Sequence, residues 1–365
     1  MTATVVIVQP YVPTYRVPFF DGLRRKLADF DIECLVAAGA PQGAQAQRGD
    51  SAHPDWLIPI NEKTINFKGR EVTLALSPTP WRNVDAVIMG LEGSSLPVYQ
   101  ALFACKARNM RFGLWGHVRP YVTPGNSLDL WLEKHQMQNA DQIFAYMPGG
   151  TRFAINNGIN PWKITTVMNT VDTDALASAI ENVTDRDIEE FADINKFDPA
   201  RTVCFLGGLD ASKRINFLAE SLERLWELDP SLSLLVAGQG KEEDLLKKAY
   251  ARGQAHPVGY ADTKKKALVL KSTRAVCMPG RIGLVAVDAL VAGSPIITTD
   301  WPFHAPEIEY LGEGTSRITA PNNPIAYAEM ILDYVEHASG FDAFDYPKLD
   351  TMIDNFAHGV MKMLS

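Results

Sequence analysis

The chain has 365 residues, of which 46% are hydrophobic and 21% are charged, and its formal net charge is -8. These values are ordinary for a globular protein and exclude a disordered or fibrous chain. The charge is uneven, because residues 1–180 carry 16 basic and 15 acidic side chains whereas the remainder carries 19 and 28. This balance argues against a nucleic-acid polymer as a partner and leaves room for a local basic face on the first half that contacts anionic lipid.

The sequence has no segment with the apolar length that spans a bilayer, and its opening apolar run lacks the preceding positive charge of a signal peptide. Its four cysteines stand far apart, without metal-ligand or redox spacing. Buried free thiols in a reducing compartment are the favoured interpretation. We therefore expect a cytoplasmic protein.

In the first half, short apolar runs alternate with amphipathic segments. We predict strands at residues 4–8, 32–37, 86–89, 111–115 and 142–146, with helices between them. This alternation predicts an α/β fold with a doubly wound parallel sheet, whose ligand-binding loops follow the carboxyl ends of the strands. The length of the chain suits two such domains, and we assign the first to residues 1–178.

The pattern changes near residue 170, and a charged stretch leads into a second alternating series. Strands at residues 202–206, 232–237, 275–278 and 296–299 define a second domain, which we assign to residues 196–345. A last amphipathic segment predicts a helix at the end of the chain, and we expect this helix, within residues 348–365, to cross back onto the first domain.

The helix between the last two of these strands carries an anomaly. It begins near Gly283 and is apolar on every face except at Asp288, whose carboxylate needs a polar partner. Free amides at Ile282–Leu284 favour an anion, and Asp288 lies roughly 7 Å farther along the axis. A nucleotide diphosphate would place its phosphates on the amides and its ribose on Asp288. The alternative is a structural pair of Asp288 with Arg281 or Arg274.

Four motifs follow one another in the second half: a glycine turn at Gly207-Gly208 that leads to Lys213 and Arg214, a Gly-x-Gly turn at Gly238, the pair Gly259-Tyr260, and Gly283-Leu284 with Asp288. In this order they resemble the donor-binding domain of GT-B glycosyltransferases, closest to glycosyltransferase family 4, whose members are retaining enzymes. The resemblance covers residues 200–320 well and residues 1–175 more loosely. It implies two Rossmann-like domains that face a central cleft.

The resemblance also implies roles for individual residues. Lys213 would stabilise the leaving diphosphate, and Asp288 would bind the ribose. Two positions depart from the family, because Gly280 stands where relatives have the first Glu of a carboxylate pair and Gly208 replaces a phosphate-binding Arg. We therefore expect a second cation, Arg281 in preference to Arg214. The expected donor-binding residues are Gly207, Gly208, Lys213, Arg214, Gly238, Gly259, Tyr260, Arg281, Ile282, Gly283, Leu284 and Asp288.

In the first domain, His117 ends a predicted strand, and in relatives a histidine after this strand lies beside the donor sugar, so we expect it to orient that sugar. Glu92 follows another strand and is a candidate acceptor ligand or base. Tyr11, Tyr15 and Arg16 are candidates for an acceptor pocket, and a turn packed on the next helix is an equal alternative for them.

These expectations combine into a retaining glycosyltransferase with His117, Lys213 and Arg281 as its catalytic set. The donor would be a nucleotide-diphosphate sugar, UDP- or GDP-linked or similar. The acceptor would be a hydroxyl of a saccharide or lipid-linked molecule, in polysaccharide, glycolipid or glycoconjugate biosynthesis. We expect no cofactor and no metal, and peripheral contact with the inner face of the membrane through the N-terminal domain. Two alternatives stay open, a sugar-nucleotide epimerase on the same fold and a non-catalytic nucleotide-sugar binder.

Overall fold

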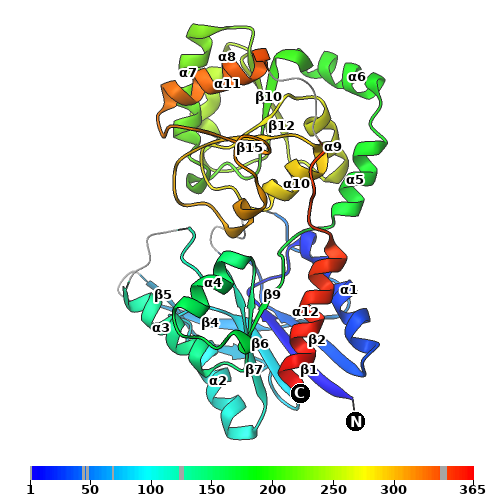
Figure 1. Ribbon diagram of the computed structural model, residues 1–365, viewed down its shortest axis with the longest axis vertical. Coiled ribbons are helices and arrows are strands. Elements are labelled where there is room, and N and C mark those ends of the chain that lie inside the picture. The colour runs from blue at the N-terminus through cyan, green and yellow to red at the C-terminus, as the bar shows by residue number, and fades with distance from the viewer. Residues whose placement is uncertain (1, 43–45, 47–48, 68–69, 123–126, 338–342) are drawn as a thin grey trace. The chain divides into compact units, whose positions relative to one another are not determined.

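The computed structural model describes residues 2–365 except 43–45, 47–48, 68–69, 123–126 and 338–342. Contacts divide the chain into two compact units (Figure 1). Unit 1 consists of residues 1–171 and 348–365, and unit 2 consists of residues 172–347. Each unit is an α/β domain with its own parallel sheet.

The sheet of unit 1 has seven parallel strands in the order β3-β2-β1-β6-β7-β8-β9. They are buried, β-branched runs such as β1, which suit the interior of a parallel sheet. The strands are β1 (Ala3–Gln9), β2 (Ile32–Ala38), β3 (Leu57–Pro59), β6 (Ala86–Gly90), β7 (Arg111–Gly116), β8 (Gln142–Ala145) and β9 (Ile164–Thr166).

The helices of unit 1 are α1 (Val17–Ala28), α2 (Leu96–Arg108), α3 (Ser127–Asn139), α4 (Pro148–Asn156) and α12 (Leu349–Leu364). Local sequence sets their ends: α2 has a proline in its first turn, and Asn109 after its last residue adopts the left-handed conformation with φ 56°. The C-terminal helix α12 packs beside α1, and its Phe356 stacks on Phe144 with 4.3 Å between ring centroids.

Unit 2 has six parallel strands in the order β12-β11-β10-β13-β14-β15. They are β10 (Thr202–Leu206), β11 (Ser233–Ala237), β12 (Ala255–Gly259), β13 (Val276–Cys277), β14 (Ile296–Thr299) and β15 (Arg317–Ala320). The helices are α5 (Thr173–Glu181), α6 (Asp185–Asn195), α7 (Ile215–Leu228), α8 (Lys247–Ala251), α9 (Thr263–Lys271), α10 (Val285–Ala292) and α11 (Pro324–His337).

The predicted parallel α/β architecture is confirmed, and each of the nine predicted strands is present to within about two residues. Sequence reasoning missed the strands β3, β9, β12 and β15, which are short. It also missed the antiparallel hairpin of β4 (Asn61–Phe67) and β5 (Arg70–Ser77). Short edge strands lack the continuous apolar run of interior strands, and for this reason they escape a search for apolar runs.

The expectation of buried free thiols is confirmed, because all four cysteines are unpaired and buried. Burial raises the pKa of the Cys105 thiol to about 12, so this thiol stays protonated and unreactive. Within the described part of the chain, no helix combines the length and the hydropathy needed to cross a membrane.

Candidate functional site

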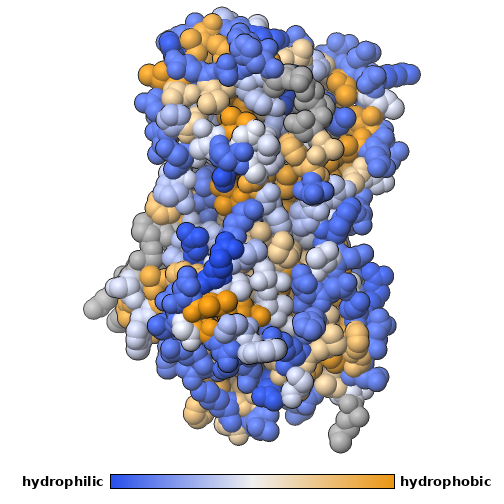
Figure 2. Space-filling view, in the orientation of Figure 1, coloured by the Kyte–Doolittle hydropathy of each residue, from blue (hydrophilic) through white to orange (hydrophobic). Residues whose placement is uncertain are grey.

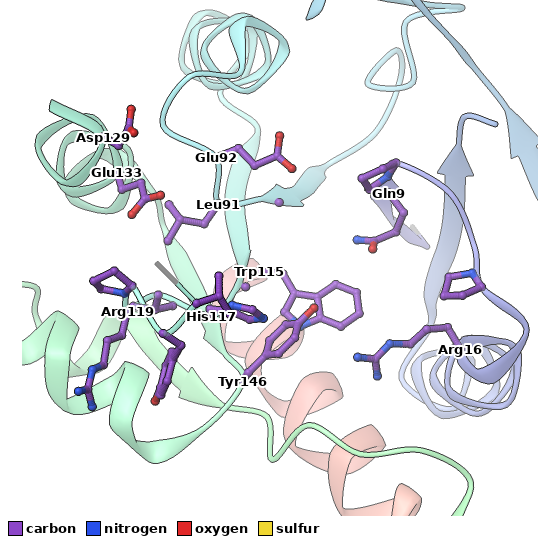
Figure 3. Close-up of a pocket in the computed structure, with 18 of the residues that line it drawn as sticks. Gln9, Arg16, Leu91, Glu92, Trp115, His117, Arg119, Asp129, Glu133 and Tyr146 are labelled. Atoms are coloured by element: carbon purple, nitrogen blue, oxygen red, sulfur yellow. The ribbon is translucent and has the colours of Figure 1, made fainter. Parts of the chain in front are cut away.

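Unit 1 contains a pocket of about 660 Å³ (Figure 3). Its walls are formed where β1, β6, β7 and β8 end, at residues such as Gln9, Gly90 and Trp115. Successive strands are added on opposite sides of β1: β2 and β3 lie on one side of it, and β6 to β9 lie on the other. In open α/β sheets ligands bind at this switch point, outside the carboxyl ends of the strands. The fold therefore places the pocket where a ligand site is expected.

Three carboxylates line one side of this pocket: Glu92 from the loop after β6, and Asp129 and Glu133 from α3. Burial raises the pKa of Glu133 to about 7, and the neighbouring Asp129 and Glu92 add to the shift. The pKa of Glu92 is also raised, by desolvation and by Glu62. Glu92 is an exposed residue at the wall of the pocket. This side of the pocket can both donate and accept hydrogen bonds near neutral pH.

The raised pKa of Glu133 predicts a loss of stability as the pH rises. Between its ordinary value of 4.5 and about 7, Glu133 holds a proton in the folded chain that the unfolded chain has released. The free energy of unfolding therefore falls as the pH rises through this window. When the pH is raised from 5 to 7.5, the Tm of Glu133→Gln should therefore rise by about 2 °C relative to the Tm of the wild type.

Thermal unfolding followed by circular dichroism at the two pH values checks this expectation. Glu189→Gln, at an exposed position of α6, is the control. Identical pH dependence of Tm in Glu133→Gln and the wild type would contradict the assignment.

The opening loop contributes three of the predicted acceptor residues to the pocket, namely Tyr11, Tyr15 and Arg16. Arg16 is buried and donates to the carbonyl of Thr170 at 3.2 Å and to Oδ1 of Asn169 at 2.6 Å. Its guanidinium also lies over several aromatic rings, among them those of Trp115 and Tyr146. Arg16 therefore fixes the opening loop to the segment that follows β9, and its role in acceptor binding stays a prediction.

His117 follows β7 and lines the same pocket (Figure 3). Its ring packs edge-on against Tyr146, with 5.1 Å between centroids, and against Tyr121 at 6.2 Å. α4 begins directly behind it, because a Cβ on Gly150 would lie 2.5 Å from the His117 carbonyl oxygen. The structure thus brings His117 and Glu92 to one pocket, as members of two different loops.

Unit 2 has its own switch point, between the neighbouring strands β10 and β13. The turns that follow these two strands interlock: the backbone amide of Arg281 donates to the Ser212 carbonyl at 2.8 Å, and the side-chain Nζ of Lys213 donates to the Arg281 carbonyl. Lys213 and Arg281 therefore lie together at the position where a parallel sheet binds its ligand.

Glycine makes this close approach possible at two places. A Cβ on Gly280 would lie 2.4 Å from the carbonyl carbon of Lys213, and a Cβ on Gly238 would lie 1.8 Å from the carbonyl oxygen of Gly207. No side chain fits in either space. The departure at Gly280 thus has a steric cause: the backbone of Lys213 occupies the space that a Glu would need.

Gly208 is different. A Cβ there would meet only Oδ2 of Asp210 at 3.4 Å and the carbonyl of Gln239 at 4.0 Å, which are ordinary contact distances. The absence of the family's Arg at Gly208 therefore has no steric cause in the surrounding backbone.

The two candidate second cations have different surroundings. Arg214 donates to the Pro279 carbonyl at 3.2 Å, and its guanidinium lies 4.2 Å from the Phe217 ring centroid and 5.5 Å from that of Trp301. These contacts hold Arg214 against the core of unit 2. The backbone of Arg281 lies in the turn beside Lys213, and the role of Arg281 as the second cation stays a prediction.

Asp288 has a basic partner that sequence reasoning did not name. Asp288 is 6% exposed, and its carboxylate accepts from Nζ of Lys266 on α9 at 2.9 Å. The expectation of a polar partner is confirmed, but the partner is Lys266, and neither Arg281 nor Arg274 forms the pair. This ion pair supports the structural alternative for Asp288, and ribose binding stays a prediction.

The start of α10 also differs from expectation. The helix begins at Val285, and the amide of Ile282, expected to be free for an anion, donates to Nδ1 of His304 at 3.2 Å. Burial lowers the pKa of His304 to about 4, which keeps this ring neutral and able to accept. The Ile282 amide is therefore satisfied within unit 2, because the buried loop around His304 packs against it.

The remaining donor candidates lie at the same edge of the unit 2 sheet. Gly259 ends β12 with φ +71°, a left-handed conformation suited to glycine, and Tyr260 after it is exposed. Gly283 and Leu284 precede α10. Among the residues that the structure describes, no cluster of three His, Cys, Asp or Glu side chains could hold a metal ion.

Two Rossmann-like units with ligand loops at their switch points define the class: the chain has the fold of the GT-B glycosyltransferases. The Anabaena protein HepE (Alr3699), solved with UDP and glucose, aligns with a TM-score of 0.67 and 12% identity over 99% of this chain and 100% of that one. A UDP-GlcNAc 2-epimerase from Methanocaldococcus jannaschii aligns with a TM-score of 0.60 and 12% identity over 98% and 100% of the two chains.

The family match lies within unit 2 and includes the end of α6. Residues 186–345 match the family described as Glycosyl transferases group 1. A phosphatidyl-myo-inositol mannosyltransferase from Mycolicibacterium smegmatis is 30% identical over 160 residues, which is 41% of this chain and 39% of that protein. The chain thus matches about two fifths of the length of this relative. The resemblance to GT-B glycosyltransferases inferred from the motifs is confirmed.

Sequence reasoning missed Asp129 and Glu133. Both belong to α3 and lie more than 35 residues after Glu92 in the chain. Their only local signal is a pair of acids four residues apart on a helix, which also occurs on solvated helix faces. Only the packing of α3 beside the loop after β6 identifies them as pocket residues.

Proposed function

We propose that the protein is a retaining, family 4-like glycosyltransferase that transfers a sugar from a nucleotide-diphosphate sugar to a hydroxyl acceptor. One observation supports this function above the others: Lys213 and Arg281 lie on interlocked turns at the switch point of unit 2. These turns belong to the segment that matches Glycosyl transferases group 1. Unit 2 binds the donor in this proposal, and unit 1 binds the acceptor.

The chemistry requires stabilisation of a leaving group. When the bond between the anomeric carbon and the phosphate oxygen breaks, negative charge develops on the diphosphate, and Lys213 with Arg281 stabilises it. The acceptor hydroxyl attacks from the same face and forms the new bond to the anomeric carbon. Its proton passes to the departing phosphate oxygen. No metal or cofactor takes part in the proposed reaction.

The pocket of unit 1 suits an acceptor that carries several hydroxyl groups. Its carboxyl groups at Glu92 and Glu133 accept or donate hydrogen bonds, depending on protonation. His117 is proposed to hydrogen bond with the donor sugar. The proposed acceptor is a saccharide or a lipid-linked molecule used in polysaccharide, glycolipid or glycoconjugate biosynthesis.

Names of related proteins guide the choice of substrates. HepE was solved with UDP and glucose, so UDP-glucose is the first donor to test, followed by GDP-mannose because one relative is a mannosyltransferase. The structural likeness to a UDP-GlcNAc 2-epimerase supports one alternative, a reaction that alters the nucleotide sugar without an acceptor.

Calorimetric binding of UDP and GDP, combined with a turnover assay in the presence of EDTA, tests the proposal. Nucleotide release that depends on the acceptor, together with a glycosylated product, is the expected result. An altered nucleotide sugar formed without acceptor would favour the epimerase. Tight binding without turnover on any acceptor would favour the non-catalytic binder.

Substitution of Asp288 distinguishes ribose binding by this residue from a purely structural ion pair. If Asp288 binds the ribose, Asp288→Asn should raise the Kd for the nucleotide diphosphate about tenfold, which corresponds to about 1.4 kcal/mol. Lys266→Met removes only the partner and should change the Kd much less. Calorimetry on both variants measures the difference. Equal Kd values for Asp288→Asn and the wild type would restrict Asp288 to its pair with Lys266.

A further inference from the structure

The loop that carries Glu92 is bound by side chains from two helices of unit 1. This loop, residues 91–95, connects β6 to α2. The hydroxyl of Tyr99 on α2 donates to the Gly93 carbonyl at 2.8 Å. Nε2 of Gln136 on α3 donates to the Glu92 carbonyl at 2.7 Å. The two side chains therefore hold consecutive carbonyl groups of the loop.

The loop also packs directly on α3. A Cβ on Gly93 would lie 3.0 Å from the carbonyl oxygen of Asp129 and 3.3 Å from Cγ of Glu133. Asp129, Glu133 and Gln136 follow one another at intervals of four and three residues, which places them on one side of the helix. This side of α3 therefore supplies both the two acids of the pocket and the amide that binds the loop.

The side chain of Glu92 folds over the end of β6. Its Oε1 would lie 3.7 Å from a Cβ on Gly90, the last residue of that strand, and both residues line the pocket. Figure 3 shows Glu92 and Glu133 on the same side of this pocket. The direction of a side chain follows from its backbone, so the bonds to the loop carbonyls fix where the Glu92 carboxylate meets a ligand.

Gln136 is buried at a cost in stability. The residue is 0% exposed, and its Oε1 accepts no hydrogen bond from any residue that the structure describes. Polar side chains otherwise gather on the surface, as the largely hydrophilic face in Figure 2 illustrates. A buried oxygen without a partner costs free energy that an apolar side chain of similar size would avoid. The Glu92 carbonyl has a second donor, the amide of Ser95 at 3.1 Å, so it stays hydrogen-bonded without Gln136.

We propose that Gln136, together with Tyr99, is a positioning residue that holds the loop of residues 91–95 so that Glu92 binds a hydroxyl of the acceptor. Neither side chain is part of the pocket wall, so both act through Glu92. A purely structural glutamine would stabilise the chain, whereas Gln136 serves the pocket at the expense of stability. The contact with an acceptor rests on the proposed function, but the position of Glu92 can be measured without an acceptor.

Gln136→Met tests this role kinetically, since methionine has a similar size and no hydrogen-bond donor. With UDP-glucose as donor and octyl β-glucoside as acceptor, we expect the KM for the acceptor to rise about tenfold, because a small displacement of a binding group weakens its contact. The kcat and the KM for UDP-glucose should change less than about twofold. The Tm should stay level or rise, because the variant removes the buried oxygen without a partner.

The titration of Glu92 gives a measurement that needs no substrate. Burial is the main cause of its raised pKa, and Glu62 adds to the shift. A released loop gives the carboxyl group more water, so its pKa should fall toward the ordinary value of 4.5 in Gln136→Met. Carbon-13 NMR of labelled glutamate carboxyl groups measures this pKa, and Glu92→Gln assigns the signal.

Gln142→Met is the matched control, because Gln142 is buried in the same unit and its Nε2 donates to Thr165 on β9 at 2.7 Å. It should leave the acceptor KM and the titration of Glu92 unchanged. Tyr99→Phe removes only the hydroxyl that binds the loop and should shift both quantities in the same direction as Gln136→Met. It decides the question if Gln136→Met does not fold.

An unchanged titration of Glu92 in both Gln136→Met and Tyr99→Phe would overturn the proposal, with or without turnover. An acceptor KM equal to that of the wild type in both variants would also overturn it. A lower Tm in Gln136→Met without either change would make Gln136 a structural residue. Absence of turnover on any acceptor, together with a shifted titration, would refute the proposed function alone.

Discussion

Lys213→Ala is expected to lower kcat/KM for sugar transfer by about 100- to 1,000-fold, or roughly 3–4 kcal/mol of transition-state stabilisation. The effect is large because the ammonium lies where the turns after β10 and β13 interlock, the position proposed for the leaving diphosphate. Arg281→Ala should cost about 10- to 100-fold, because its charge acts on the same anion. Steady-state kinetics with a saturating acceptor measure both losses.

Lys247→Ala is the matched control for this prediction. Lys247 lies on α8, is mostly exposed and pairs with Asp244, so its loss should leave kcat/KM unchanged. Arg214→Lys tests the assignment from the other direction. We expect that variant to lose stability more than turnover, because Arg214 packs on Phe217. Full turnover in Lys213→Ala would remove the basis of the proposed function.

Gly280→Ala is expected to lower the Tm by about 5 °C, since overpacking of a filled space costs about 1–3 kcal/mol. The added methyl group would lie 2.4 Å from the carbonyl carbon of Lys213, and backbone atoms cannot move aside as the end of a flexible side chain can. The two turns would separate, so donor binding should weaken by tenfold or more. Gly280→Glu, which restores the residue of the relatives, should be no better tolerated.

Gly208→Ala is the control for this effect, because a Cβ at that position meets its nearest neighbour, Oδ2 of Asp210, at an ordinary 3.4 Å. We expect it to leave the Tm nearly unchanged. Differential scanning calorimetry with and without UDP separates the stability effect from the binding effect. Equal behaviour of Gly280→Ala and Gly208→Ala would show that the contact with Lys213 is easily relieved.

The positions of the loops could be predicted from the sequence, but their contacts could not. The glycine turns at Gly207 and Gly238 are visible in the sequence because each follows a buried strand, and both turns lie at the edge predicted for them. The sequence does not reveal that Gly280 lies against the backbone of Lys213, which is 67 residues earlier. From the sequence, glycine at position 280 therefore indicates the loss of a functional Glu, whereas in the structure a side chain at this position would collide with the backbone of Lys213.

The same limit applies to the charged residues. The apolar surroundings of Asp288 predicted that it needs a partner, and the partner, Lys266, follows from the packing of α9 against α10. Glu133 was not recognised as a pocket residue, because an acid on an amphipathic helix is usually solvated. Its partial burial in the pocket wall, with Asp129 and Glu92 as neighbours, raises its pKa to about 7.

The sequence by itself determined the alternating α/β architecture, most of the interior strands and the last helix. These features depend on local patterns: β-branched apolar runs, glycine turns and helical periodicity within a few consecutive residues. Only the tertiary structure decided which turns interlock, which base neutralises Asp288 and which acids share the pocket of unit 1. Such contacts join residues far apart in the chain, and their geometry depends on how whole helices and strands pack, which no short sequence pattern specifies.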